Sequence, residues 1–259
     1  MKHFIFHPRG SVPASVLVSM TTGYDYLGAV DGTPVDDAQA AKVEALERDV
    51  YDKLFPHAAT RLRVQAIMGA CLTSGSGSAS SSANKLFLFL GKVANGKTAF
   101  TSGLVKSTLG EYYGTLDSHK WCAGLLENRK RKLVVMENAP VVDASAMKLL
   151  TREENLVFRK LYSNTVEMAF YPKLLMVSNT VPRLSGMAED AFTMHWMYPV
   201  DFVSTFDPEA KQDDPVNLVW MPQNSVQLDA YYKEQAPYHM LLMLKYARRF
   251  IQDGRRLPA

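Results

Sequence analysis

The sequence predicts an α/β fold in which helices flank a central, mostly parallel sheet. Three short and continuous apolar runs are typical of strands buried on both faces, and they occupy residues 86–90, 133–136 and 174–177. The segments between these runs are long enough for the crossover connections that parallel strands need. Helical patterns dominate the chain ahead of the first run, so we also expect a small helical N-terminal subdomain.

The composition supports a soluble globular protein. Of the 259 residues, 47% are hydrophobic and 21% are charged, which suits one compact core or a core with a small attached subdomain. Disordered, collagen-like and coiled-coil chains are excluded by the same figures. No apolar run approaches the roughly 18 to 20 residues that cross a bilayer, and the start lacks the features of a signal peptide. We therefore expect an intracellular location, in a host cytoplasm or at a replication site, and no membrane partner.

Charge is unevenly distributed along the chain. Residues 1–60 contain five Lys or Arg against eight Asp or Glu, so the remainder carries a net charge of +6 within the total of +3. We expect any anion site in that later part. The two cysteines, Cys71 and Cys122, are too few for a disulfide framework or a zinc site, so buried thiols are expected. The six histidines show no ligand spacing, which argues against a metal other than Mg²⁺.

The chain ahead of the first strand contains two helical patterns. Residues 1–36 have little periodicity and form an irregular lead-in, after which a helix is expected from Asp36 to just before Pro56. A second helical pattern covers about 58–72, and a Ser/Gly-rich stretch at 73–82 is typical of a flexible surface loop. We divide the chain into a lead-in and helical subdomain (1–84), a sheet-containing core (85–206) and a C-terminal helical extension (207–259).

A phosphate-binding pattern follows the first predicted strand directly. It fits G-x-x-x-x-G-K-S/T and consists of Gly91, Lys92, Val93, Ala94, Asn95, Gly96, Lys97 and Thr98. Helix-compatible residues continue to 109 and stop at Gly110. In this context backbone N–H groups and the helix dipole face the phosphates, Lys97 adds a mobile charge and Thr98 can ligate Mg²⁺. The sequence therefore predicts ATP and Mg²⁺ as cofactors of a P-loop core.

Polar side chains end the other two predicted strands. Glu137 follows the second run, at the strand end where open α/β sheets bind ligands, and could polarise the attacking water and help to position Mg²⁺. Position 136, where many P-loop ATPases have a first acid, is Met. Asn179 follows the third run, and its amide could bind the γ-phosphate or the lytic water.

Together these motifs resemble the superfamily 3 helicases of viruses, phages and plasmids, especially the helicase half of poxvirus-type primase-helicases. The resemblance depends on the Asn before Gly-Lys in the P-loop, the single Glu137 and the Asn-x-x-Pro that ends in Pro182. It covers about 43–206, with weaker similarity at 236–239.

The resemblance implies an AAA+ fold assembled as a ring, usually a hexamer, that uses ATP to move along single-stranded DNA and separate duplexes in replication. It implies that Lys97 and Thr98 hold the phosphates and Mg²⁺, that Glu137 is the catalytic carboxylate and that Asn179 is the sensor.

The resemblance also implies a DNA-facing segment, for which Lys148, Arg159 and Lys160 are the candidates. Cationic side chains in a pore can follow a phosphate backbone without reading sequence. A primase or another replication protein is an expected partner, because the chain length leaves no room for the primase domain that relatives often carry upstream.

One departure from the family concerns the arginine that reaches the γ-phosphate of a neighbouring subunit. No Arg occurs between Arg183 and Arg248, whereas the family normally has an Arg-rich strand after the sensor Asn. Such a trans-acting arginine is worth about 10³ to 10⁵ in rate. Arg183 could substitute, or less well His195 or Lys211. Otherwise the ATPase is slow, or a second type of subunit supplies the group.

Two alternatives stay open at the level of sequence. A P-loop small-molecule phosphotransferase would use the same loop but would respond to a small acceptor and not to DNA. A catalytically weak, nucleotide-binding replication scaffold would bind ATP and DNA yet hydrolyse ATP poorly, because it lacks its arginine finger.

Overall fold

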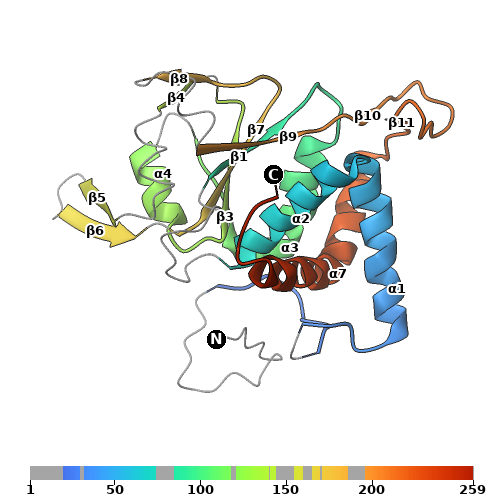
Figure 1. Ribbon diagram of the computed structural model, residues 1–259, viewed down its shortest axis with the longest axis horizontal. Helices are drawn as coiled ribbons and strands as arrows, with labels where there is room; N and C mark the ends of the chain where they lie inside the picture. Colours follow the sequence, from blue (N-terminus) through green and yellow to red (C-terminus); the bar gives the residue numbers. More distant parts are fainter. Residues whose placement is uncertain are drawn as a thin grey trace.

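A five-stranded parallel sheet lies at the centre of the computed structural model (Figure 1). The structure describes residues 20–29, 32–73, 85–117, 121–139, 141–143, 155–159, 165–169, 171–185 and 196–258. In spatial order the strands are β2 (Tyr113–Thr115), β3 (Leu133–Glu137), β7 (Lys173–Ser178), β1 (Leu86–Leu90) and β9 (Met197–Asp201). The predicted α/β class is confirmed, and the three predicted strands are the three adjacent central ones, β3, β7 and β1.

The central strands contain continuous apolar runs because each of their faces meets a separate core, and their polar residues Glu137, Lys173 and Ser178 lie at strand ends. In β1, Phe87 and Phe89 belong to one hydrophobic cluster, whereas Leu86 and Leu88 belong to another on the opposite face. Side chains alternate across a strand, so a strand that is covered on both sides shows no polar position.

Helices cover both faces of this sheet. The larger cluster contains side chains of α1 (Asp37–Leu46), the π-helical η1 (Glu47–Asp52), α2 (Ala58–Leu72) and α7 (Ser225–Gln252). The helix after β1 also contributes to it, as π-helical η2 (Ala99–Val105) continued by α3 (Lys106–Leu109) and the 3₁₀ turn η3 (Gly110–Tyr112). On the other face, Leu125 of α4 (Trp121–Asn128) packs in the smaller cluster.

The predicted helix starts agree with the structure. Asp36 caps α1, and its carboxylate accepts a hydrogen bond from the backbone N–H of Gln39 at 2.8 Å. The helical pattern at about 58–72 corresponds to α2. Cys71 on this helix is fully buried, as expected, and burial raises the pKa of its thiol to about 12. Residues 74–84, which include most of the predicted Ser/Gly-rich loop at 73–82, lie outside the described residues.

Within the described residues, three small two-stranded sheets accompany the central one. β5 (Asn155–Arg159) pairs antiparallel with β6 (Thr165–Ala169), while β4 (Val141–Asp143) pairs parallel with β8 (Arg183–Ser185). β10 (Thr205–Phe206) pairs parallel with β11 (Val219–Trp220) just before α7 begins.

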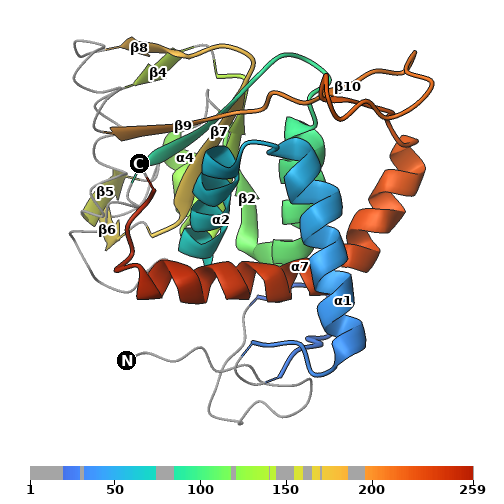
Figure 2. The same ribbon diagram turned by 45° about the vertical axis from the view of Figure 1, so that its right-hand side comes forward.

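The C-terminal part is only partly helical. Residues 207–224 hold β11 and loops, and α7 supplies the helix. Figure 2 shows that the first part of α7 runs at a steep angle to its second part, and Pro237 lies inside the helix. Among the described helices, none has the length and apolar character needed to cross a membrane.

Candidate functional site

A cavity of about 740 Å³ lies at the carboxyl edge of the central strands. The register pairs Glu137 with Val177 and Leu90 with Ser178, so β3, β7 and β1 end at nearly the same level. The cavity is lined by residues 92–98 of the P-loop, by Glu137 and by Asn179. The topology thus brings together three segments that are far apart in the sequence, at the edge where α/β sheets bind ligands.

Two glycines permit the path of the P-loop. Gly91 and Gly96 have φ values of 151° and 82°, which side chains rarely adopt. A Cβ atom on Gly91 would lie 2.0 Å from Asn95 Nδ2, so any side chain there would collide with the loop itself. The backbone N–H of Phe100 then bonds the carbonyl of Gly96 at 2.8 Å, and the helix begins directly after the loop.

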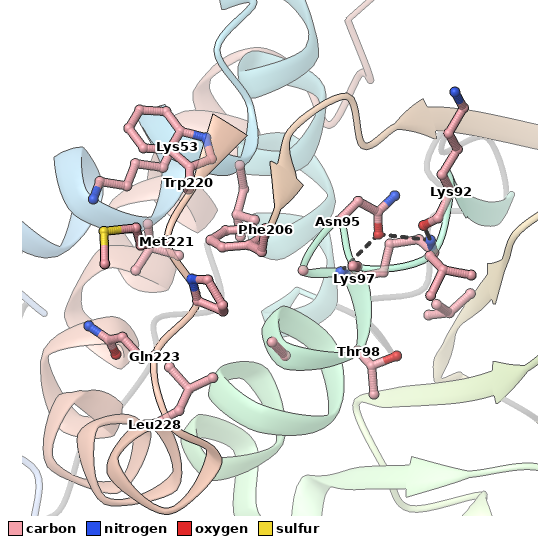
Figure 3. A pocket seen from close by; sticks show the side chains of 18 of the residues that line it. Lys53, Lys92, Asn95, Lys97, Thr98, Phe206, Trp220, Met221, Gln223 and Leu228 are labelled. Carbon is pink, nitrogen blue, oxygen red and sulfur yellow. Dashed lines mark hydrogen bonds between the residues drawn. The ribbon is translucent and has the colours of Figure 1, made fainter. Parts of the chain in front are cut away.

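The Lys97 ammonium is held inside the loop. Nζ donates hydrogen bonds to the carbonyls of Gly91 at 2.7 Å and Lys92 at 2.8 Å, and to Asn95 Oδ1 at 2.8 Å (Figure 3). Burial lowers the pKa of this lysine. All three partners are neutral acceptors, so the positive charge is available to an anion that enters the cavity.

Glu137 and Thr98 present oxygen atoms to the cavity. Both residues are exposed, and Glu137 Oε1 accepts a hydrogen bond from Ser102 Oγ at 2.7 Å. Met136 is fully buried among apolar side chains and offers no ligand. Within the described part of the chain there is no cluster of three His, Cys, Asp or Glu that could hold a metal. A hydroxyl and one carboxylate fit Mg²⁺, which commonly uses one or two carboxylates with substrate phosphates and keeps several waters.

Asn179 is exposed at the cavity edge, directly after β7. The turn that carries it is shaped by Ser178, whose hydroxyl donates to the carbonyl of Thr180 at 2.7 Å. Asn179 thus lies at the carboxyl end of the strand next to β1, at the edge of the cavity that the P-loop also lines.

The far side of the cavity is aromatic and apolar, and sequence reasoning missed it. Figure 3 shows Phe206, Trp220, Met221 and Leu228 across the cavity from Lys97. The wall also includes Tyr231 and Tyr232 of α7. Residues 49–50 and 53–54, which lie next to or within η1, complete it. The aromatic residues are visible in the sequence, but nothing local indicates that residues 206–232 return to the P-loop.

Within this wall, electrostatic contacts join Lys53, next to η1, to the segment that contains β11. Lys53 Nζ lies 4.9 Å from the centre of the Trp220 ring and 3.2 Å from Asp213 Oδ2. The backbone N–H of Phe206 donates to the carbonyl of Ala94 at 2.7 Å, which links the P-loop to the same wall.

Of the residues predicted to face DNA or a neighbouring subunit, Arg183 and Lys211 are not among the described residues that line the cavity. Arg159 ends β5, where it pairs with Thr165 across the hairpin, and Arg183 is the exposed first residue of β8. Lys211 is exposed in the loop between β10 and β11. Lys148, Lys160 and His195 lie outside the described residues.

No model of a known protein family matches the sequence, and no curated protein matches it either. Two solved structures of the C-terminal region of NrS-1, both described as apo A forms, share the fold. One is 12% identical with a TM-score of 0.53, covering 83% of this chain and 48% of that one. The other is 14% identical with a TM-score of 0.52, covering 80% and 47%. The chain thus spans about half the length of these structures, and at such identities the likeness concerns the fold.

Proposed function

We propose that this chain is an ATP-dependent DNA helicase of the superfamily 3 type, an AAA+ ring motor that moves along single-stranded DNA. The observation that carries the proposal is the meeting of Lys97, Thr98, Glu137 and Asn179 around one cavity at the carboxyl edge of a parallel sheet. A cationic loop, a carboxylate and an amide at this edge are the groups that nucleotide hydrolysis requires.

Each group has a role in this proposal. Lys97 and the N–H groups of the P-loop bind the phosphates, Glu137 orients and deprotonates the attacking water, and Asn179 holds the γ-phosphate or that water. Mg²⁺, held by Thr98 with help from Glu137, would neutralise charge on the phosphates when bound. The aromatic wall around Phe206 and Trp220 offers stacking surface for the nucleoside.

The cavity lacks one part of a complete hydrolase. No arginine is among the residues that line it within the described part of the chain. A neighbouring subunit in the ring, through Arg183 or His195, or a second type of subunit would supply that charge. DNA would contact Lys148, Arg159 and Lys160. A catalytically weak nucleotide-binding scaffold is the second candidate function, because the absence of an arginine from the described cavity lining favours it.

The decisive experiment measures assembly state and ATPase rate together, with and without single-stranded DNA, for the native chain and Lys97→Ala. We expect DNA-stimulated hydrolysis by an oligomer, and at least a 100-fold loss in the variant, because the charge that stabilises the transferred phosphoryl group is removed.

Other outcomes would select the alternatives. Turnover by a monomer that responds to a small acceptor and not to DNA would indicate a phosphotransferase. Binding of ATP and DNA with negligible hydrolysis by the assembled protein would indicate the scaffold. Glu137→Gln is the matched test of the carboxylate, since it should retain ATP binding and lose hydrolysis.

A further inference from the structure

Ser102 lies between the P-loop helix and the candidate catalytic carboxylate. It is on η2, four residues beyond Thr98, and its Oγ is 2.7 Å from Glu137 Oε1. On its other side, Oγ is 3.2 Å from the hydroxyl of Tyr113 on β2. Three elements of the core thus meet at one serine hydroxyl.

The direction of these hydrogen bonds follows from proton counting. A carboxylate has no proton to give, so Ser102 donates to Glu137, and its single hydrogen is then used. Tyr113 must therefore donate to Ser102. Burial, with a smaller contribution from the charge of Glu137, raises the pKa of Tyr113 to about 12, so the phenol keeps its proton. The chain of bonds runs in one direction, from Tyr113 through Ser102 to Glu137.

We propose that Ser102 is a positioning residue that holds the Glu137 carboxylate by Oε1 and leaves Oε2 to face the attacking water. This inference rests on the proposed function. Glu137 is exposed at a strand end, and a glutamate there loses considerable side-chain entropy when it is fixed in one orientation. A hydrogen bond that fixes it before ATP arrives removes that cost from the reaction step. The donor is on a π-helical segment, a conformation found frequently at functional sites.

The test replaces Ser102 in the full-length protein and measures steady-state ATP hydrolysis. Ser102→Ala should lower kcat about tenfold, the rate equivalent of one ordinary hydrogen bond, with KM for ATP changed less than twofold. Ser102→Thr, which keeps the hydroxyl, should restore most of the rate. Tyr113→Phe removes only the outer bond and should lower kcat by about two- to threefold.

Ser107→Ala is the matched control, because it makes the same change on the same helix, on α3. It should leave kcat and KM unchanged. A native or raised kcat in Ser102→Ala would overturn the positioning role, as would an equal loss in Ser107→Ala or no rescue by threonine. The Glu137→Gln variant distinguishes a failure of the positioning role of Ser102 from a failure of the proposed ATPase function. If Glu137→Gln is inactive while Ser102→Ala is fully active, only the inference about Ser102 fails.

Discussion

Asn95 connects the P-loop lysine to the segment that follows the edge strand β9. The residue is only 3% exposed, with Oδ1 accepting from Lys97 Nζ at 2.8 Å and Nδ2 donating to the carbonyl of Phe202 at 3.2 Å. A buried amide that satisfies both its oxygen and its nitrogen fixes the loop in one arrangement.

Asn95→Asp should weaken ATP binding by about 10- to 100-fold. The variant keeps the shape of the side chain but places a negative charge beside Lys97, where it pairs with the ammonium and repels phosphate. Titration with a fluorescent ATP analogue measures the affinity. Gln252→Glu, an equal change of charge at the exposed last residue of α7 and outside the cavity, should bind like the native protein. Native affinity in Asn95→Asp would contradict this account of the loop.

His239 joins three helical elements in the interior. Its Nε2 is 2.8 Å from the hydroxyl of Tyr51 on η1, and its Nδ1 is 2.7 Å from Oγ1 of Thr108 on α3. Thr108 donates its own hydrogen to the carbonyl of Leu104, so it must accept from His239. The imidazole is therefore neutral, with its proton on Nδ1, and Tyr51 donates to Nε2. Burial lowers the pKa of His239 from 6.5 to about 3.

This histidine makes stability depend on pH. The unfolded chain takes up a proton below pH 6.5, while the folded chain does not until the pH approaches 3. Its stabilising contribution is thus complete above pH 6.5 and is lost as the pH falls, by about 1.4 kcal/mol per unit. Urea unfolding between pH 7.5 and 5 should show this loss in the native chain and a smaller one in His239→Gln. Equal slopes in both proteins would contradict it.

A helix ahead of the P-loop and the C-terminal helix meet in one hydrophobic core. α2, ahead of the P-loop, packs closely on the second part of α7, and both contribute to the cluster that covers one face of the sheet. The contact is tightest at Gly69 of α2, where an added Cβ would lie 2.6 Å from the carbonyl oxygen of Tyr246.

Gly69→Ala should lower the free energy of unfolding by about 1 to 3 kcal/mol, although alanine is the better helix former. The new methyl group meets the backbone of α7, which cannot move aside as a flexible side chain would. Urea denaturation measures the change, and Thr60→Ala, on the same helix and half-buried, is the control. A stabilised Gly69→Ala protein would show that α2 and α7 are less closely packed.

The features that could be predicted from the sequence alone are those that depend on neighbouring residues. Buried runs predicted β1, β3 and β7, Asp36 predicted a helix start, and glycine spacing predicted the P-loop, because hydrophobic burial, capping and positive φ are local requirements. Which distant groups meet depends on the path of the folded chain. The aromatic wall with Trp220 and the bond from Ser102 to Glu137 arise because the chain crosses the sheet and returns, and no local pattern records the partner of a side chain that far away.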